Sequence, residues 1–467
     1  TENKKIYVAL ADPLDMHKID DLKLLLDTEI EAVLSYEEDI LESINKYYGV
    51  GAEILEDIMA RTDMEDKMKF RRSTIEDLES AVEDASIIKF VNHIFTQAIE
   101  DRATDIHLEP FEDELRIRFR IDGFLYEIPI PESLRLFHQA IVSRIKVMAN
   151  LDIAEHRLPQ DGRIKIKIKA DELDFRVSVL PSYLGEAVQV RILSSTSLLS
   201  LERLGFDDDD LPKIQELINK AHGIIFVTGP TGSGKSTSLY SCLSKRNLPG
   251  IKIITTEDPV EYQIRGITQI QIQPKIGLNF AACLRSILRH DPDIVMVGEV
   301  RDVETAEITI RSAMTGHLVF STLHTNDAPS APIRLIDMGI EPFLVASSLE
   351  GVIAQRLVRV ICSECKQKSR TSSEPFKEQG LDIKDDFVDI YQGKGCEACR
   401  FTGYRGRTAI FEILMINEDI RNLILHKATS QAIKEKAVQS GMYSLRQSGL
   451  KKVLAGITTL SEVIRVS

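Results

Sequence analysis

The chain has 467 residues, 43% of them hydrophobic and 28% charged, and its formal net charge is −14. This length predicts two to four domains with sizeable cores. The sequence contains neither an apolar run of the roughly 18–20 residues that a membrane-spanning helix needs nor a signal-peptide core. Composition therefore disfavours an integral membrane protein, a secreted disulfide scaffold and a disordered chain.

The first 84 residues carry nearly all of the acidic excess, with 10 basic and 23 acidic side chains and a net charge of −13. Apolar periodicity in residues 1–50 predicts strands at 6–10 and 30–34 and helices at 19–26 and 37–48. Residues 51–84 are interpreted as a charged linker with some helix. Because like charges repel, the acidic residues 1–84 are poorly suited to bind nucleic acid or anionic lipid. We interpret them as a solvated acidic surface.

Residues 85–200 predict an α+β domain. A helix is expected at 87–99, and strands at 115–121, 163–169, 173–180 and 187–193. Two of these strands alternate apolar with basic residues, so their basic faces could bind polyanions. They lack interleaved aromatic residues and the chain has no Trp, so base stacking is not indicated.

Residues 201–467 predict an α/β domain. Short apolar runs at 224–227, 251–254, 294–297 and 318–320 are separated by helical stretches, which is typical of a largely parallel sheet buried on both faces. The part from 410 to 467 is expected to be helical, most clearly over 420–453.

A complete phosphate-loop motif, G-x-x-x-x-G-K-[ST], lies between a predicted strand and a predicted helix. Its residues are Gly229, Pro230, Thr231, Gly232, Ser233, Gly234, Lys235, Ser236 and Thr237. Its backbone N–H groups and the helix N-terminus favour phosphate. Lys235 is expected to bridge the β- and γ-phosphates and Ser236 to bind Mg²⁺, so the motif predicts an ATP or ADP site.

Glu257 and Glu299 each follow a predicted strand, where side chains reach the ligand crevice of such sheets. We expect them to divide metal holding and water activation, with Glu299 beside Ser236 as the Mg²⁺ ligand. The alternative is that one of them only supports its loop. Asp291 and Asp293 precede a strand and are poorer candidates.

His317 and His324 flank the strand 318–323. The functional interpretation is a γ-phosphate sensor or a subunit-interface hydrogen bond, with His324 as the catalytic candidate, and the alternative is a structural histidine. Arginines that could stabilise phosphoryl charge are Arg163, Arg176, Arg285, Arg289, Arg301 and Arg407. Taken singly, each is more often a surface charge.

Four of the six cysteines form two C-x-x-C pairs, Cys362 with Cys365 and Cys396 with Cys399, separated by 30 residues. This pattern predicts a tetrahedral zinc site in an element spanning 362–399. A shell of four thiolates leaves no open position, so the metal would be structural. Reduced structural thiols and a redox pair are the alternatives. Cys242 and Cys283 are interpreted as core residues.

From about residue 85 onward the sequence resembles the secretion ATPases of bacterial type II secretion and type IV pilus assembly. Besides the phosphate loop, residues 255–262 look like that family's Asp box, 284–302 its atypical Walker B segment with Gly before Glu299, and 315–326 its His box. The four-cysteine element resembles that of the assembly ATPases.

This resemblance implies a RecA-like motor domain preceded by a PAS-like domain, in a homo-hexamer. Arg163, Arg176 and Arg407 match positions where the family uses arginines from outside the core to reach the nucleotide. Residues 1–50 resemble the latter part of a partner-docking domain. The family works at the cytoplasmic face of the inner membrane, held there by inner-membrane platform and cytoplasmic-domain proteins of the machine.

The expected function is therefore that of a Mg²⁺-dependent ATPase that drives assembly of a pilus-like fibre. Residues 340–349 and 351–358 favour type II secretion over pilus extension. The rivals are a RecA-like nucleic-acid translocase, which the acidic front argues against, and a nucleotide-gated interaction module that barely turns over.

Overall fold

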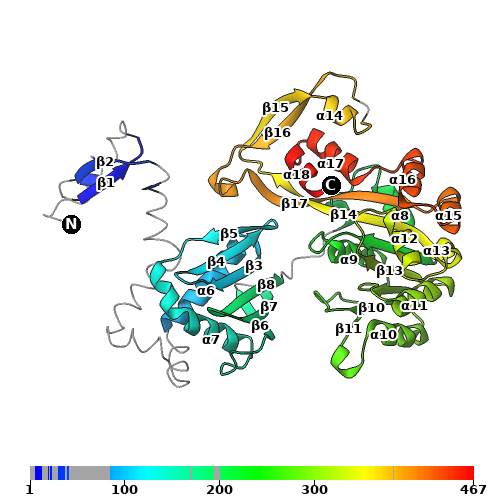
Figure 1. Ribbon diagram of the computed structural model, residues 1–467, viewed down its shortest axis with the longest axis horizontal. Helices are drawn as coiled ribbons and strands as arrows, with labels where there is room; N and C mark the ends of the chain where they lie inside the picture. Colours follow the sequence, from blue (N-terminus) through cyan, green and yellow to red (C-terminus); the bar gives the residue numbers. More distant parts are fainter. Residues whose placement is uncertain are drawn as a thin grey trace. The chain divides into compact units, whose positions relative to one another are not determined.

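The computed structural model describes residues 6–12, 19, 22–23, 30–36, 39–40, 85–168, 171–193, 200–381 and 383–467. The chain divides into two units, residues 1–195 and 196–467 (Figure 1). The linker predicted over 51–84 lies outside the described residues, as does most of the two predicted N-terminal helices. The two N-terminal strands are confirmed: β1 (Ile6–Leu10) and β2 (Ile30–Leu34) pair in parallel.

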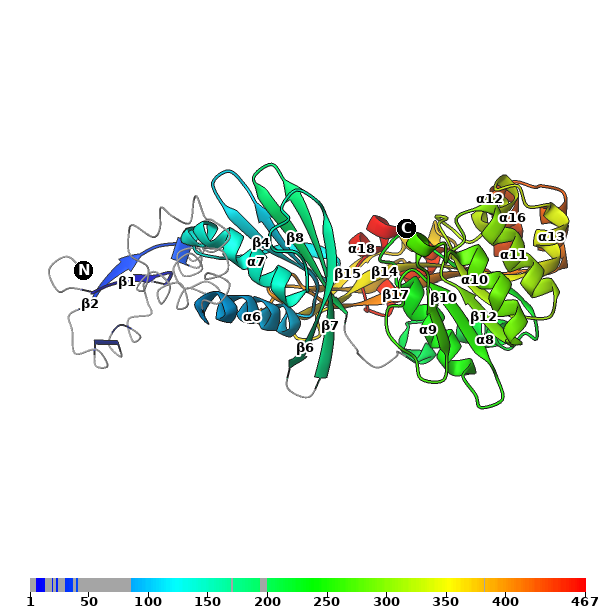
Figure 2. The same cartoon turned by 90° about the horizontal axis from the view of Figure 1, so that it is seen from below.

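The first unit contains a six-stranded antiparallel sheet in the order β5-β4-β3-β8-β7-β6. Its strands are β3 (Ala103–Pro110), β4 (Leu115–Ile121), β5 (Phe124–Ile128), β6 (Gln160–Ile168), β7 (Asp171–Ser182) and β8 (Gly185–Leu193). Helices α6 (Ala85–Glu100) and α7 (His138–Met148) cover one face (Figure 2). Strand alternation sends residues such as Phe119 and Phe175 into this core and basic residues to the other face.

The second unit is built on a seven-stranded sheet in the order β11-β10-β12-β13-β9-β14-β17. Its strands are β9 (Gly223–Thr228), β10 (Ile253–Glu257), β11 (Thr268–Gln271), β12 (Ile294–Val297), β13 (Leu318–Leu323), β14 (Leu349–Ile361) and β17 (Tyr404–Met415). All neighbours run parallel except β14 and β17. The predicted α/β class and the strands predicted at 224–227, 294–297 and 318–320 are confirmed, whereas the strand predicted at 251–254 begins two residues later, at Ile253, and runs to Glu257.

Helices cover both faces of this sheet, which explains why its strands are continuous apolar runs. One face carries α8 (Leu211–Ile218) and α9 (Lys235–Arg246). The other carries α10 (Phe280–Ile287), α11 (Val303–Met314), α12 (Ser330–Asp337), α13 (Pro342–Ser348), α15 (Glu418–Leu425) and α16 (Ser430–Gln439). The carboxyl ends of the parallel strands form one edge, where the phosphate loop, Glu257, Glu299 and His324 lie.

The prediction of helix from residue 410 is wrong for its first residues, because β17 continues to Met415. Residues 409–414 are all buried between helices, and apolar contact on both faces stabilises a strand there. The helices begin at Glu418, and α17 (Leu445–Leu454) and α18 (Leu460–Val466) complete them. Asn417, Thr429, Ser444 and Thr459 each accept an N-cap hydrogen bond, which divides this part into four helices.

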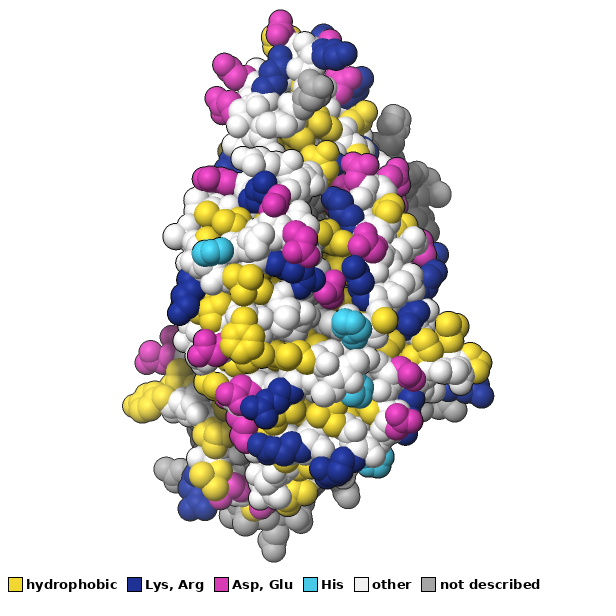
Figure 3. Space-filling model, turned by 90° about the vertical axis from the view of Figure 1, so that its right-hand side faces the viewer, with side chains coloured by type: hydrophobic (Ala, Val, Ile, Leu, Met, Phe, Trp, Pro, Cys, Tyr) yellow, Lys and Arg dark blue, Asp and Glu magenta, His cyan; other side chains and the backbone are white. Residues whose placement is uncertain are grey.

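Between β14 and β17 the chain forms a separate two-stranded antiparallel ribbon, β15 (Lys366–Ser372) and β16 (Phe387–Gly393), with the short helix α14 (Glu374–Lys377). Within the described residues, no helix combines the length and the apolar character needed to cross a membrane. On the face drawn in Figure 3, acidic and basic side chains are interspersed rather than gathered into a field of one sign.

Candidate active site

The phosphate loop connects β9 to α9 at the carboxyl edge of the sheet. Gly234 caps α9 with φ = 87°, a left-handed conformation that glycine adopts without a steric penalty. At Gly229, with φ = 149°, a Cβ atom would lie only 2.6 Å from the carbonyl oxygen of Gln355. These two glycines therefore allow the loop to pack closely against β14 while keeping its turn.

Lys235 begins α9, and its Nζ donates to the carbonyl oxygens of Gly229 (2.8 Å) and Pro230 (3.0 Å). Burial lowers the pKa of Lys235, while the negative charge of Glu299 raises it. Ser236 is exposed on the first turn of α9. Ser233 is buried, and its hydroxyl has no hydrogen-bond partner among the described residues. The loop thus presents an ammonium and hydroxyls, the groups that bind phosphate and Mg²⁺.

Glu299 follows β12, and its side chain is 13% exposed. Its Oε2 lies 2.7 Å from Nε of Arg301 and 3.6 Å from Nε2 of His324, which follows β13. Glu299 also acts electrostatically on Lys235. The structure therefore gathers Lys235, Glu299 and His324 from three neighbouring strand ends.

Glu257 ends β10 and has a different environment. It is buried and accepts hydrogen bonds from the hydroxyls of Tyr240 and Thr255 and from Gln269 Nε2 (3.1 Å). Burial raises the pKa of the Tyr240 hydroxyl, and the charge of Glu257 raises it further. Both carboxylate oxygens of Glu257 are thus occupied by side chains of this unit, whereas Glu299 faces the charged groups of the site.

The other histidine does not belong to the site. His317 precedes β13, and its Nδ1 lies 2.9 Å from the carbonyl oxygen of Ser312 and 3.2 Å from Thr315 Oγ1. Asp293 likewise accepts from the backbone N–H of Lys252 at the amino end of the sheet. These positions fit the structural alternative for His317 and the low priority given to Asp293.

Two residues of β14 that lie against the phosphate loop, Gln355 and Arg356, were not predicted from the sequence. Gln355 accepts from Ser238 Oγ (2.7 Å), and its Nε2 would lie 2.8 Å from a Cβ atom at Gly234. Arg356 Nη1 would lie 3.1 Å from a Cβ atom at Gly229. The signal available in the sequence was an arginine inside an apolar strand pattern, since charged residues are rarely placed in a central strand without a partner.

The predicted arginines occupy different surroundings. In the first unit, Arg163 on β6 lies directly opposite Arg176 on β7, which in turn faces Arg191 on β8. Arg191 donates to the buried Asp105 at 2.9 Å, and Arg120 lies 3.8 Å from the same carboxylate. Like charges in directly opposite positions are destabilising, and the carboxylate of Asp105 offsets this repulsion at the Arg191 end of the row. Arg191 was missed.

In the second unit, Arg407 lies on β17 opposite Arg359, near the cysteines. Arg301 pairs with Glu299, Arg285 pairs with Glu304, and Arg289 donates to the carbonyl oxygen of Arg285. Of these four, only Arg301 lies against a predicted catalytic residue.

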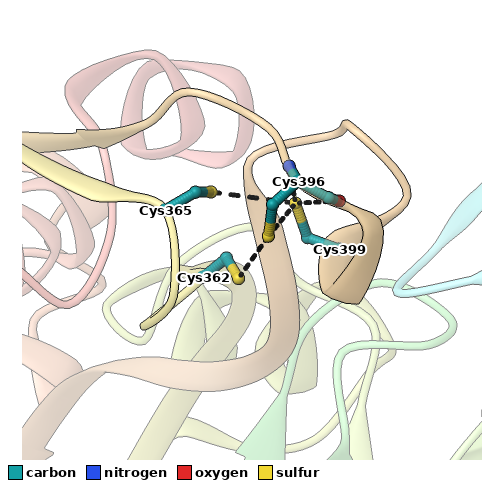
Figure 4. A group of neighbouring side chains, drawn as sticks. All are labelled: Cys362, Cys365, Cys396 and Cys399. Atoms are coloured by element: carbon teal, nitrogen blue, oxygen red, sulfur yellow. Dashed lines mark hydrogen bonds between the residues drawn. The ribbon is translucent and has the colours of Figure 1, made fainter. Parts of the chain in front are cut away.

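The four cysteines meet at the base of the ribbon (Figure 4). The Sγ–Sγ distances are 3.8 Å for Cys362–Cys396, 3.8 Å for Cys365–Cys399 and 3.7 Å for Cys396–Cys399. Zinc–thiolate bonds of about 2.3 Å give a tetrahedron with edges of about 3.8 Å, whereas a disulfide needs about 2.05 Å. Backbone N–H groups of Gly395, Cys396 and Gly403 point at the sulfurs of Cys365 and Cys399; burial raises the pKa of the two thiols, whereas these bonds lower it. The donor set therefore fits zinc.

Comparison with known proteins shows one family over most of the chain. A family model described as type II/IV secretion system protein matches residues 80–465, and a model of the MshEN domain matches residues 1–54. The type IV pilus assembly ATPase PilB of Myxococcus xanthus is 47% identical over 98% of this chain and 82% of that protein. Type II secretion system protein E of Dickeya dadantii is 50% identical over 84% of this chain and 78% of that protein.

Two solved structures have folds similar to that of this chain. The pilus retraction motor PilT with bound ADP has a TM-score of 0.54 and 28% identity, covering 80% of this chain and 96% of that chain. The ATPase DotB of Legionella pneumophila has a TM-score of 0.59 with 21% identity, covering 81% and 95%. The latter likeness concerns the fold alone.

Proposed function

The chain belongs to the type II/IV secretion system protein family, and we propose how its residues hydrolyse ATP and which process this hydrolysis drives. The protein is an ATP-hydrolysing motor ATPase. The observation that carries the proposal is the convergence of Lys235, Glu299 and His324 beside a complete phosphate loop.

In this mechanism, Lys235 leaves the carbonyls of its own loop and neutralises the β- and γ-phosphates. Glu299 orients the attacking water and accepts its proton, and His324 senses the γ-phosphate from the next strand. Ser236 would hold Mg²⁺, a cation that prefers oxygen ligands and would neutralise phosphate charge, and Glu299 would be its carboxylate ligand where Glu257 takes the role of base. Glu257 remains the second candidate for metal holding, although its oxygens already accept three hydrogen bonds.

Arginines from another copy of the chain complete the site in this proposal. Arg163 and Arg176 are candidates because they lie opposite each other in the row that also contains Arg191. Arg407 is a further candidate on the second unit. Such a site requires an oligomer, and we propose the homo-hexamer of the family, with residues 85–200 acting as its PAS-like domain.

The motor drives assembly of a pilus-like fibre. Type II secretion is the first candidate, because the relatives named type II secretion system protein E reach 50% identity. Pilus extension is the second, because PilB is 47% identical over 98% of the chain. Partners would be the inner-membrane platform and cytoplasmic-domain proteins of such a machine, at the cytoplasmic face of the inner membrane. The MshEN match supports a docking role for residues 1–54.

Lys235→Ala tests the catalytic assignment. The rate of ATP hydrolysis should fall by at least about a hundredfold, because the transferred phosphoryl group loses its ammonium. Lys245→Ala is the matched control, since Lys245 lies exposed in the last turn of the same helix. An unchanged rate in Lys235→Ala would overturn the assignment.

The two rivals give different kinetics. Stimulation of hydrolysis by single-stranded DNA, with steep salt dependence, would favour a nucleic-acid translocase. Slow single-turnover hydrolysis with tight nucleotide retention would favour a nucleotide-gated module.

A further inference from the structure

The segment that follows β13, residues 324–328, crosses the carboxyl edge of the sheet; we call it the strap. It starts at His324, which faces Glu299. From β13 the neighbouring strands are β9, β14 and β17, in that order. Each of these three strands holds one residue of the strap through a separate contact.

The first anchor comes from β9. Thr228, the buried last residue of that strand, accepts a hydrogen bond from the backbone N–H of Thr325 at 2.9 Å. The two threonine hydroxyls lie 2.8 Å apart. Since Thr228 directly precedes Gly229, this anchor joins the strap to the start of the phosphate loop.

The second anchor comes from β14. Arg356 donates from Nη2 to the carbonyl oxygen of Asn326 (2.7 Å) and from Nη1 to that of Gln355 (3.0 Å). Its guanidinium therefore lies between the strap and the phosphate loop, close to Gly229. Burial lowers the pKa of Arg356, and the charges of Glu412 and Asp327 counter this effect.

The third anchor comes from β17. Glu412 is 1% exposed, and its Oε1 accepts from the backbone N–H of Ala328 at 2.8 Å. Its Oε2 accepts from the backbone N–H of Leu445 at 3.2 Å, the first residue of α17. One buried carboxylate thus ties the end of the strap to the start of a C-terminal helix.

We propose that Arg356 and Glu412 are positioning residues that hold the strap, so that His324 and Glu299 keep their places relative to the phosphate loop. This inference rests on the proposed ATPase site. Neither residue touches the reacting atoms, but misplacing a catalytic group by about 1 Å can cost about a hundredfold in rate. The strap is also linked to α17, because Glu412 accepts from Ala328 in the strap with one oxygen and from Leu445 of α17 with the other.

Arg356→Lys and Glu412→Gln are the test variants. Lysine keeps the charge but loses the planar fork that reaches two carbonyl groups. Glutamine keeps the volume but offers one acceptor where two N–H groups need one each. We expect kcat for ATP hydrolysis to fall about 10–100-fold, with the nucleotide Kd changed by less than about threefold.

Arg421→Lys and Glu350→Gln are the matched controls. Arg421 likewise donates to a backbone carbonyl, that of Ala346, and pairs with Glu350 at 2.7 Å. This pair lies at the amino end of β14, away from the strap. Both controls should retain kcat within about threefold, even where they lower the melting temperature.

Hydrogen exchange separates positioning from general stability. In the test variants, amides of residues 325–328 should exchange faster than in the wild type, and in the controls they should not. Reduced kcat with unchanged exchange, or an equal loss of kcat in the controls, would overturn the inference. If the wild type hydrolyses ATP and Lys235→Ala does not, the proposed function stands whatever the strap variants do.

Discussion

Two glutamates with the same sequence setting have different roles in the structure. Glu257 and Glu299 each follow a buried strand, and the sequence alone could not separate them. Hydrogen bonds from Tyr240, Thr255 and Gln269 occupy Glu257, whereas Glu299 lies against Arg301 and His324 and acts on Lys235. The environment of each carboxylate, rather than its position in the chain, therefore distinguishes the enclosed Glu257 from Glu299, which lies among charged groups.

Removing one of the hydrogen-bond donors to Glu257 is expected to lower the stability of the second unit. Tyr240→Phe leaves a buried carboxylate oxygen without its hydroxyl donor, a loss of about 1.5–3 kcal/mol for a hydrogen bond to a charged group. We expect the melting temperature of the second unit to fall by several degrees. Differential scanning calorimetry measures this change.

Tyr262→Phe is the control, because Tyr262 packs edge-on against Tyr240 with ring centroids 4.7 Å apart. It should lower the melting temperature by less than half as much. Equal effects of the two substitutions would mean that the loss of either tyrosine hydroxyl, and not of the bond to Glu257 in particular, lowers the melting temperature.

Among the elements, the ribbon with its cysteines stands apart from the main sheet. It has a small core of its own, in which Phe376 packs with Leu450, Val453 and Val463 of the C-terminal helices. Its base is fixed by the backbone bonds Cys362 N–H to Gly403 O (3.0 Å) and Ile361 N–H to Ile457 O (2.9 Å). A metal held by the four cysteines would add a further link at this base.

Metal removal tests this element. Protein purified under reducing conditions without chelator should carry about one zinc per chain, measured by elemental analysis. Removing it should increase protease cleavage within residues 366–393, because the four sulfurs no longer share a ligand. Cys362→Ser should lose the metal, and Cys242→Ala, which changes a buried cysteine outside the cluster, should keep it. Zinc-free protein with an intact ribbon would contradict the assignment.

For the whole molecule, the row of arginines and the phosphate loop belong to different units of the chain. If arginines of one copy complete the site of another, two inactive variants should complement each other. The Lys235→Ala chain lacks the ammonium of the phosphate loop but keeps Arg176. The Arg176→Ala chain keeps the ammonium but lacks that arginine. Mixing them should restore part of the ATP hydrolysis rate, since some sites in a mixed ring receive both groups.

The control mixture is Lys235→Ala with Glu299→Gln. Both residues lie in the same unit of the same chain, so every site in this mixture keeps one defect and the rate should stay low. Failure of the first mixture to exceed either parent would exclude arginine donation between copies. The rate per chain should also rise with protein concentration in the wild type.

Local sequence patterns were enough to predict several structural features of this protein. The glycines of the phosphate loop, the apolar runs of β9, β12 and β13 and the two C-x-x-C pairs are each readable within a dozen residues, because backbone conformation, burial on both faces and metal chelation impose short-range requirements.

Only the tertiary structure decided that residues 404–415 form an edge strand, that Glu257 is enclosed while Glu299 faces the site, and that Thr228, Arg356 and Glu412 hold one strap. The contact of Thr228 with Thr325 spans 97 positions, and that of Glu412 with Ala328 spans 84. Contacts of this kind leave no periodicity in the sequence, since they depend on which strands become neighbours in the sheet.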